Sequence, residues 1–138
     1  METTTRPTSV SATPAAHPSE AVRHFSDLLR YETDCADVHA SRKRRDYVLL
    51  DVRSPALYEA GHVPGAINLP HGRIVERNLA DYAPDALFVV YCSGPHCNGA
   101  DKGALALARL GRSVKKMIGG VTGWIDEGYE LTTCPEPE

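Results

Sequence analysis

The sequence of 138 residues lacks any apolar run long enough to cross a membrane. A membrane-spanning helix needs about 20 consecutive, mostly apolar residues. The N-terminal stretch METTTRPTSVSATPAAHPS also lacks the apolar core of a signal peptide. These two absences argue against a membrane protein and predict a cytoplasmic location.

The sequence also has no excess of charge of one sign. Lys and Arg together number 15 and Asp and Glu 18, which gives a formal net charge of −3. Nucleic acids and anionic membrane surfaces attract strongly basic chains, so the composition indicates neither as a partner. Aromatic residues make up only 7%, but the hydrophobic fraction of 42% is sufficient for the core of one compact domain.

Cysteine is scarce, with four residues: Cys35, Cys92, Cys97 and Cys134. In a chain without secretory signals these are expected to be reduced thiols rather than a disulfide framework. We interpret Cys35 and Cys134 as structural or tail thiols.

The chain divides into three segments by composition. Residues 1–18 are rich in Thr, Ser, Pro and Ala and predict a flexible N-terminal tail. A single domain is predicted over residues 19–134, followed by a C-terminal tail at 135–138. Ser19 is expected to cap a short helix, and after a strand near residues 29–33 a second helix is expected from Asp34 to about Lys43.

Two short, β-rich apolar runs follow, at residues 47–51 and 86–91, with a weaker third at residues 113–118. They alternate with helix-like segments at 55–61, 72–82 and 99–111. Strands that alternate with helices predict an α/β fold with a largely parallel sheet.

Cys92 directly follows the second of these strands. In open parallel sheets, ligands bind beyond the carboxyl ends of the strands. Gly94 and Gly99 allow the loop to turn its N–H groups inward, and the helix that follows adds its positive end. Such surroundings favour a nucleophilic thiolate. A buried structural cysteine is the alternative interpretation.

Two stretches of the sequence resemble the rhodanese-like domain family. LLDVRSPALYEAGHVPGAINLP resembles its first signature, and the YC pair, Gly-rich loop, alanine-rich helix and MIGGVTGW resemble the second half of its pattern. The resemblance implies a five-stranded, mainly parallel sheet with helices on both faces. It also implies a sulfurtransferase that needs no metal or organic cofactor. Cys92 would take a sulfane sulfur from thiosulfate or a persulfide and pass it to a thiol or cyanide, and a protein could be donor or acceptor.

The resemblance also implies which residues form the site. The substrate-binding loop would consist of Ser93, Gly94, Pro95, His96, Cys97, Asn98 and Gly99. Asp51, Arg53, Glu59 and His62 would support it. Arg53 is expected to pair with Glu59, and His62 is expected to be a hydrogen-bonded turn residue.

The loop departs from the family pattern because it lacks the usual arginine. Only His96 and Lys102 offer cationic side chains nearby, so thiosulfate, a dianion, is expected to be a poor donor. Three roles stay open for Cys97: a packing residue, a resolving thiol that forms a disulfide with Cys92, or the nucleophile itself.

Other functions compatible with these residues are a non-catalytic rhodanese-like binding or regulatory module and a cysteine-based phosphatase or arsenate reductase. The phosphatases related to the rhodanese-like fold use a cysteine loop that ends in an arginine, and residues 93–101 contain none. A zinc site from Cys92, His96 and Cys97 would have loose spacing and no matching second ligand pair.

Overall fold

The computed structural model describes residues 6–133, and the chain divides into two units, residues 1–30 and 31–138. The first unit contains most of α1 (Pro18–Tyr31), in which no residue is buried. Its exposed apolar side chains Val22, Phe25 and Leu29 recur at helical spacing along one side. The expected helix is therefore present, but it begins at Pro18, so Ser19 lies inside its first turn and the prediction that Ser19 caps it is wrong.

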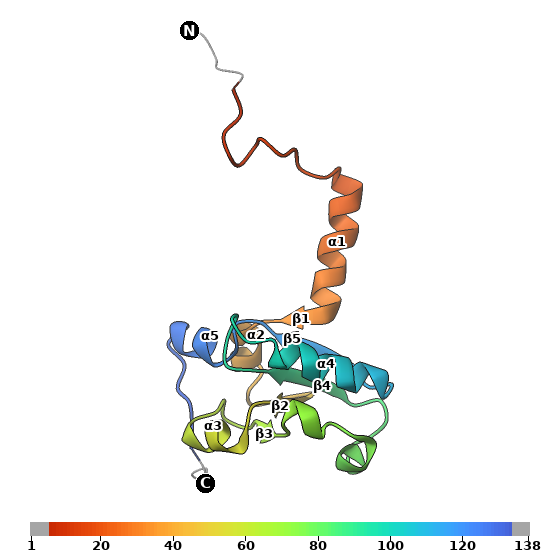
Figure 1. Ribbon diagram of the computed structural model, residues 1–138, viewed down its shortest axis with the longest axis vertical. Helices are drawn as coiled ribbons and strands as arrows, with labels where there is room; N and C mark the ends of the chain where they lie inside the picture. The colour runs from red at the N-terminus through yellow and green to blue at the C-terminus, as the bar shows by residue number, and fades with distance from the viewer. Residues whose placement is uncertain (1–5, 134–138) are drawn as a thin grey trace. The chain divides into compact units, whose positions relative to one another are not determined.

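The second unit is built around a five-stranded sheet (Figure 1). The strands are β1 (Glu32–Thr33), β2 (Val48–Asp51), β3 (Ile67–Asn68), β4 (Leu87–Tyr91) and β5 (Ser113–Met117). Their spatial order is β1-β5-β4-β2-β3, and each neighbouring pair is parallel. The predicted α/β fold with a five-stranded parallel sheet is confirmed.

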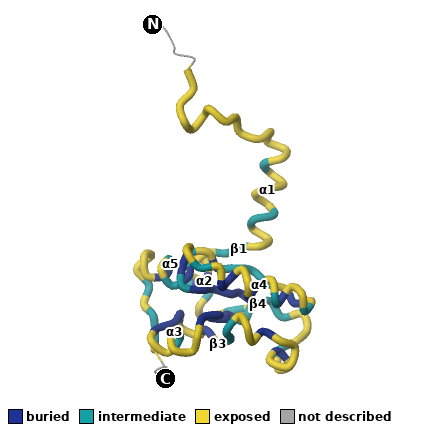
Figure 2. Tube along the Cα trace, in the orientation of Figure 1, coloured by how far each residue is buried: buried dark blue, intermediate teal, exposed yellow. Residues whose placement is uncertain are grey.

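Helices cover both faces of this sheet, and the central strands β2 and β4 are accordingly buried (Figure 2). On one face, α2 (Cys35–Ala40) and α5 (Gly120–Asp126) pack with α3 (Pro55–Ala60) nearby; on the other lies α4 (Gly99–Arg109). The core on the α2 and α5 side includes Cys35, Val38, Leu49, Val89, Tyr91 and Trp124. The core on the α4 side includes Leu50, Val52, Phe88, Val90, Cys92, Ala100 and Leu107.

Two of the predicted helices differ in the structure. The helix expected over 72–82 is replaced by two 3-10 helices, η1 (His71–Arg73) and η2 (Glu76–Leu79). Ile74 and Val75 between them are extended, because both are β-branched and Ile74 is buried in the core. The helix capped by Asp34 ends at Ala40 rather than Lys43, where the Ser41 hydroxyl donates to carbonyl oxygens of the last turn.

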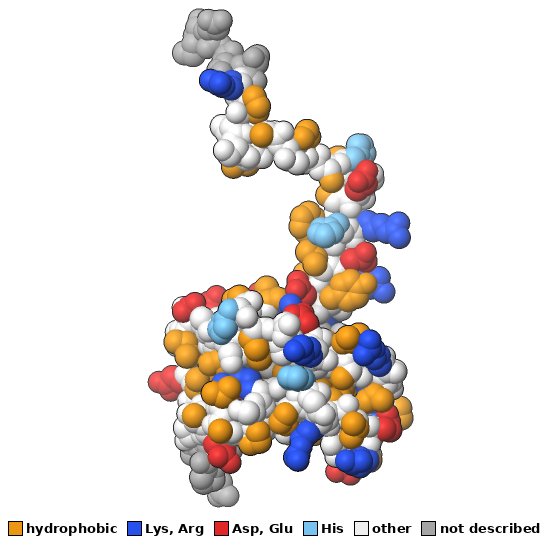
Figure 3. Space-filling model, viewed as in Figure 1, with side chains coloured by type: hydrophobic (Ala, Val, Ile, Leu, Met, Phe, Trp, Pro, Cys, Tyr) orange, Lys and Arg blue, Asp and Glu red, His pale blue; other side chains and the backbone are white. Residues whose placement is uncertain are grey.

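The surface of the second unit carries mixed charge. On the face drawn in Figure 3, cationic and anionic side chains are interspersed without a broad patch of one sign. Within residues 6–133, no helix combines the length and the apolar character needed to cross a bilayer.

Alternation along β4 determines the direction of Cys92. Successive side chains of a strand point to opposite faces of the sheet. Val89 and Tyr91 accordingly enter the core beside α2 and α5, whereas Val90 and Cys92 enter the core beside α4. Burying Tyr91 on one side therefore turns the Cys92 side chain toward the beginning of α4.

Tyr91 also ties the end of β4 to the end of β2. The register places Asp51 opposite Tyr91, and the Tyr91 hydroxyl donates to Asp51 Oδ2 at 2.7 Å. The same hydroxyl accepts from the Val63 N–H at 3.0 Å. Burial, and then the negative charge of Asp51, raise the pKa of Tyr91, so its hydroxyl stays protonated and able to donate.

The buried Asp51 carboxylate is neutralised by Arg53. The guanidinium donates to both carboxylate oxygens, at 2.7 Å in the shortest contact, and also to the Gly61 carbonyl at 2.6 Å. Asn68 donates to the backbone carbonyls of Asp51 and Arg53. This Asp51–Arg53–Tyr91 network joins β2, β4 and the segment 61–68 at the edge of the sheet where Cys92 emerges.

Replacing Asp51 with Asn should lower the free energy of unfolding by about 3–5 kcal/mol, because it leaves the buried Arg53 charge unpaired. Tyr91→Phe should lower it by about 1–3 kcal/mol, because the Val63 N–H and one Asp51 oxygen lose a partner. Urea unfolding followed by circular dichroism measures both.

Tyr82→Phe is the matched control. Tyr82 packs against Phe88, and within residues 6–133 no hydrogen bond involves its hydroxyl. The control should change the unfolding free energy by less than about 0.5 kcal/mol. Equal effects of Tyr91→Phe and Tyr82→Phe would show that the network contributes little to stability.

Candidate active site at the end of β4

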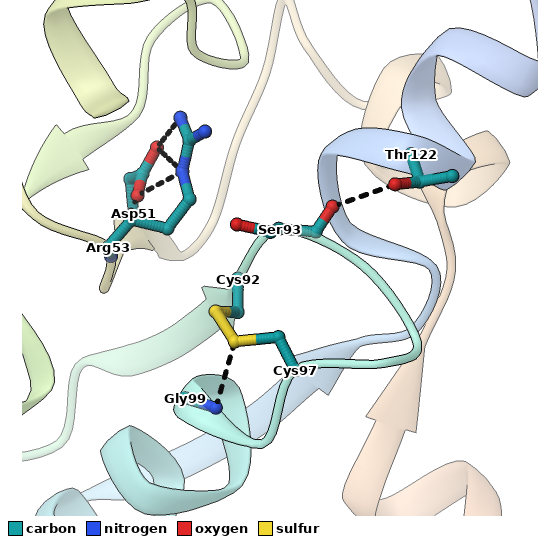
Figure 4. The surroundings of a disulfide bond; sticks show 7 residues. All are labelled: Asp51, Arg53, Cys92, Ser93, Cys97, Gly99 and Thr122. Atoms are coloured by element: carbon teal, nitrogen blue, oxygen red, sulfur yellow. Dashed lines mark hydrogen bonds and ion pairs between the residues drawn. A yellow bond between two sulfur atoms is a disulfide. The ribbon is translucent and has the colours of Figure 1, made fainter.

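Cys92 and Cys97 are joined by a disulfide in the loop between β4 and α4 (Figure 4). Their Cα atoms lie 6.4 Å apart, within the span that a disulfide requires. A turn returns Cys97 to Cys92, and in it the Cys97 N–H donates to the Gly94 carbonyl at 3.0 Å. Pairing with Cys92, one of the three possibilities left open for Cys97, is thus geometrically available. Cys97 also packs against the α4-side core.

Gly99 leaves the space in which the two sulfur atoms lie. A Cβ atom at this position would be 2.7 Å from Cys92 Sγ and 3.4 Å from Cys97 Sγ. The Gly99 N–H donates to Cys97 Sγ at 3.5 Å. Because Gly99 is the first residue of α4, this N–H belongs to the positive end of the helix, which favours negative charge on sulfur.

The other side of the loop is attached to the beginning of α5. The Val121 N–H donates to the Cys92 carbonyl at 3.1 Å, and the N–H and hydroxyl of Thr122 donate to the Ser93 carbonyl. Gly120 has a φ of 57°, and a Cβ there would overlap the Cys92 carbonyl oxygen. Only glycine permits this close approach of two backbones.

The remaining loop residues divide into buried and exposed groups. Gly94 and Gly99 are buried, Ser93 and Cys97 are half-buried, and Pro95, His96 and Asn98 are exposed. Within residues 6–133, four backbone N–H groups of the loop have no acceptor: those of Ser93, Gly94, His96 and Asn98. They are available as hydrogen-bond donors to a bound anion.

A cavity of about 560 Å³ opens beside the two cysteines. Its charged wall residues are Asp34, Asp101, Lys116 and Glu127. Lys116 Nζ lies 3.0 Å from Asp101 and 3.6 Å from Glu32, so nearby carboxylates already compensate its charge. Neither His96 nor Lys102 is part of the wall. The cavity is therefore acidic.

Cys35 is a third cysteine on the wall of this cavity. Its thiol donates to the carbonyls of Ile118 and Gly120. Burial, followed by the charges of Asp34 and Glu127, raises the pKa of Cys35 to about 11. The thiol stays protonated at neutral pH, in keeping with the structural role expected for it; Cys134 lies outside the described residues.

The expected pairing of Arg53 with Glu59 is wrong. Glu59 is exposed on α3, and Arg53 pairs instead with Asp51, toward which it points in Figure 4. The bend after β2 also directs the Arg53 N–H to Asp51 Oδ1 at 3.0 Å. An unpaired charge costs more free energy in the protein interior than at the surface. The buried Asp51 carboxylate, and not the exposed Glu59 carboxylate, therefore pairs with Arg53.

His62 is buried and hydrogen-bonded, but it lies in an isolated β-bridge with Thr132 rather than in a turn as expected. Its Nδ1 lies 2.8 Å from the Tyr58 carbonyl oxygen, and its ring stacks on Tyr58 with the centroids 3.7 Å apart. Asp51, Arg53 and His62 lie together at this end of the sheet, and none of them lines the cavity.

Several residues of the site were not predicted from the sequence. Tyr91 carries a signal, since it is the one hydroxyl-bearing residue of an otherwise apolar strand. Asp34, Thr122 and Glu127 carry none, because only folding brings their distant segments to the loop. Within residues 6–133, no three His, Cys, Asp or Glu side chains gather as a set of metal ligands.

Comparison with known sequences identifies relatives. The family model of the Rhodanese-like domain matches residues 34–127. HTH-type transcriptional regulator Rv0324 of Mycobacterium tuberculosis is 35% identical over 99 residues, which are 67% of this chain and 43% of the regulator. Thiosulfate sulfurtransferase GlpE of Pseudoalteromonas translucida is 32% identical over 82 residues, 59% of this chain and 75% of that enzyme. The chain thus spans less than half of the regulator.

A solved structure agrees with these matches. The crystal structure of a Bacillus halodurans protein superposes with a TM-score of 0.82 and 38% sequence identity, covering 85% of this chain and 87% of that one. The family match includes β2 with Asp51 as well as the cysteine loop that follows β4. The chain therefore belongs to the rhodanese-like domain family.

Proposed function

We propose that this protein is a sulfurtransferase that carries a sulfane sulfur as a persulfide on Cys92. The observation that carries the proposal is the position of Cys92 beyond the carboxyl end of β4, on a cavity wall and beside unengaged loop N–H groups. The relative named as a thiosulfate sulfurtransferase supports the same chemistry.

The reaction needs two displacements at sulfur. In the reduced protein, the Cys92 thiolate attacks the outer sulfur of the donor, the donor S–S bond breaks, and sulfite or a thiolate leaves. An acceptor thiolate then attacks the outer sulfur of the persulfide and restores the Cys92 thiolate. The disulfide with Cys97 must be reduced before the first step, because it occupies the attacking sulfur.

The acidic cavity determines the preferred donor. Asp34 and Glu127 form no salt bridge within residues 6–133, so their charges act on an entering anion. Thiosulfate enters as a dianion and is repelled more strongly than a persulfide of lower charge. We infer that a thiol persulfide is the better donor.

Sulfur loading is expected on a single tryptic peptide. Cleavage after Arg77 and Lys102 gives peptide 78–102, which contains Cys92 and Cys97, whereas Cys35 lies in 31–42 and Cys134 in 117–138. Reduced wild-type protein, freed of reductant, mixed with a sulfane donor and quenched with acid at once, should gain the mass of one sulfur atom on 78–102. Cyanide should remove it.

Cys92→Ser should remain folded and gain no sulfur on this peptide. Cys35→Ser is the matched control, because it removes a cysteine from the same cavity wall, and it should load like the wild type. If Cys92→Ser gains the sulfur and Cys97→Ser does not, the nucleophile is Cys97, and the proposal is overturned.

Removing one negative charge from the wall should improve thiosulfate as a donor. Asp34→Asn keeps a side chain able to cap α2 and should lower the KM for thiosulfate about threefold at low salt. The difference should shrink as salt screens the charge. Steady-state kinetics with thiosulfate and cyanide measure it.

Asp85→Asn provides the control, since Asp85 is exposed and lies off the cavity wall. It should leave the KM unchanged. An equal KM for wild type and Asp34→Asn at low salt would show that the acidic wall does not select the donor.

A regulatory module is the second candidate function. The relative named as a transcriptional regulator favours it. Such a module would load Cys92 without repeated turnover, whereas a sulfurtransferase passes the sulfur to a thiol acceptor over many cycles. Counting turnovers per protein distinguishes the two.

A further inference from the structure

We infer that Cys97 is a resolving thiol that expels the sulfur carried by Cys92 as hydrosulfide and closes the two cysteines into a disulfide. This gives the site a second activity, the release of sulfide without an external acceptor. The inference rests on the proposed persulfide on Cys92.

The geometry of the loop supports direct attack. Cys97 Sγ is bonded to Cys92 Sγ. Backbone hydrogen bonds hold both residues in place: the Cys97 N–H donates to the Gly94 carbonyl, and the Cys92 carbonyl accepts from the Val121 N–H. Gly99 leaves the space for both sulfur atoms and donates its N–H to Cys97 Sγ. A thiolate at position 97 is therefore stabilised where it can reach the inner sulfur of the persulfide.

The other cysteine on the cavity wall does not share this geometry. Cys35 remains a free thiol, and its S–H donates to carbonyls of the segment 118–120. Its raised pKa further disfavours the thiolate needed for attack. Of the described cysteines, Cys97 alone is placed to resolve Cys92.

The chemical step is balanced without an added oxidant. The Cys97 thiolate attacks the inner sulfur of the Cys92 persulfide, the bond between inner and outer sulfur breaks, and the outer sulfur leaves as hydrosulfide. The persulfide sulfur is reduced to sulfide while the two cysteines are oxidised to the disulfide. A dithiol reductant returns the pair to thiols for the next cycle.

The acidic wall favours an internal attacking group. An external thiolate must bring negative charge past Asp34 and Glu127, whereas Cys97 is already in the loop. Intramolecular attack has a high effective concentration as well. When neither a dithiol reductant nor a small acceptor such as cyanide is present, the protein therefore stops in the disulfide form, which cannot accept sulfur.

The test follows the fate of a single sulfur atom. Reduced protein is loaded with excess thiosulfate, desalted and incubated without reductant. Thiosulfate leaves as sulfite, so hydrosulfide detected by a sulfide electrode derives from the protein. Wild type and Cys35→Ser should release one equivalent, and their peptide 78–102 should lose the mass of two hydrogen atoms. Cys97→Ser should keep its added sulfur about tenfold longer or more.

Each other outcome has a definite meaning. Equal persulfide lifetimes in wild type and Cys97→Ser would overturn the resolving role and leave the proposed function intact. Sulfur found on Cys97 of the wild type by fragmentation of the peptide would also overturn it, as transfer without release. No sulfur on Cys97→Ser would instead contradict the proposed function. Cys97→Ala provides a second variant if circular dichroism shows that Cys97→Ser does not fold.

Discussion

The buried carboxylate of Asp51 is the constraint on which the rest of the site depends. It ends β2 in the interior of the protein, where an unpaired charge would be strongly destabilising. Arg53 and Tyr91 satisfy it, and Tyr91 can do so only because the parallel register places it opposite Asp51. With Tyr91 committed to one face of the sheet, Cys92 must turn to the other, toward the beginning of α4.

Close backbone packing then shapes the space around Cys92. Gly120 brings the start of α5 against the Cys92 carbonyl, and Gly99 leaves room for sulfur at the start of α4. Because position 99 has no side chain, the space beside the two sulfur atoms stays open. The loop's hydrogen-bond donors are backbone N–H groups and the cavity wall is acidic. In the proposed sulfurtransferase, selectivity between sulfur donors would therefore come from charge on the wall rather than from a cationic side chain in the loop.

Much of the fold was predictable from periodicity and motif. The strands at 48–51 and 87–91 and the helix at 99–109 produce strong patterns, because the two strands are buried and the helix packs an apolar side against the core. The strand at 113–117 contains two lysines and produces a weaker pattern. The two-residue strand β3 is too short to show a pattern. The helix predicted over 72–82 was wrong, since burial of Ile74 in the core decided the backbone there. The predicted ion pair of Arg53 with Glu59 was also wrong. A sequence motif shows which residues occur together, but it does not show how a bend in the backbone directs their side chains.

The sequence by itself determined the α/β class, the family resemblance and the location of a cysteine beyond a buried strand. These properties depend on local order along the chain, which the sequence states directly. Only the tertiary structure decided that Arg53 pairs with Asp51 and that Cys97 lies against Cys92. It also decided that Asp34 and Glu127 line the same cavity as these two cysteines. Such contacts depend on strand register, on turn geometry and on how closely two backbones can approach, and each of these is set by the packing of segments that are distant in the sequence.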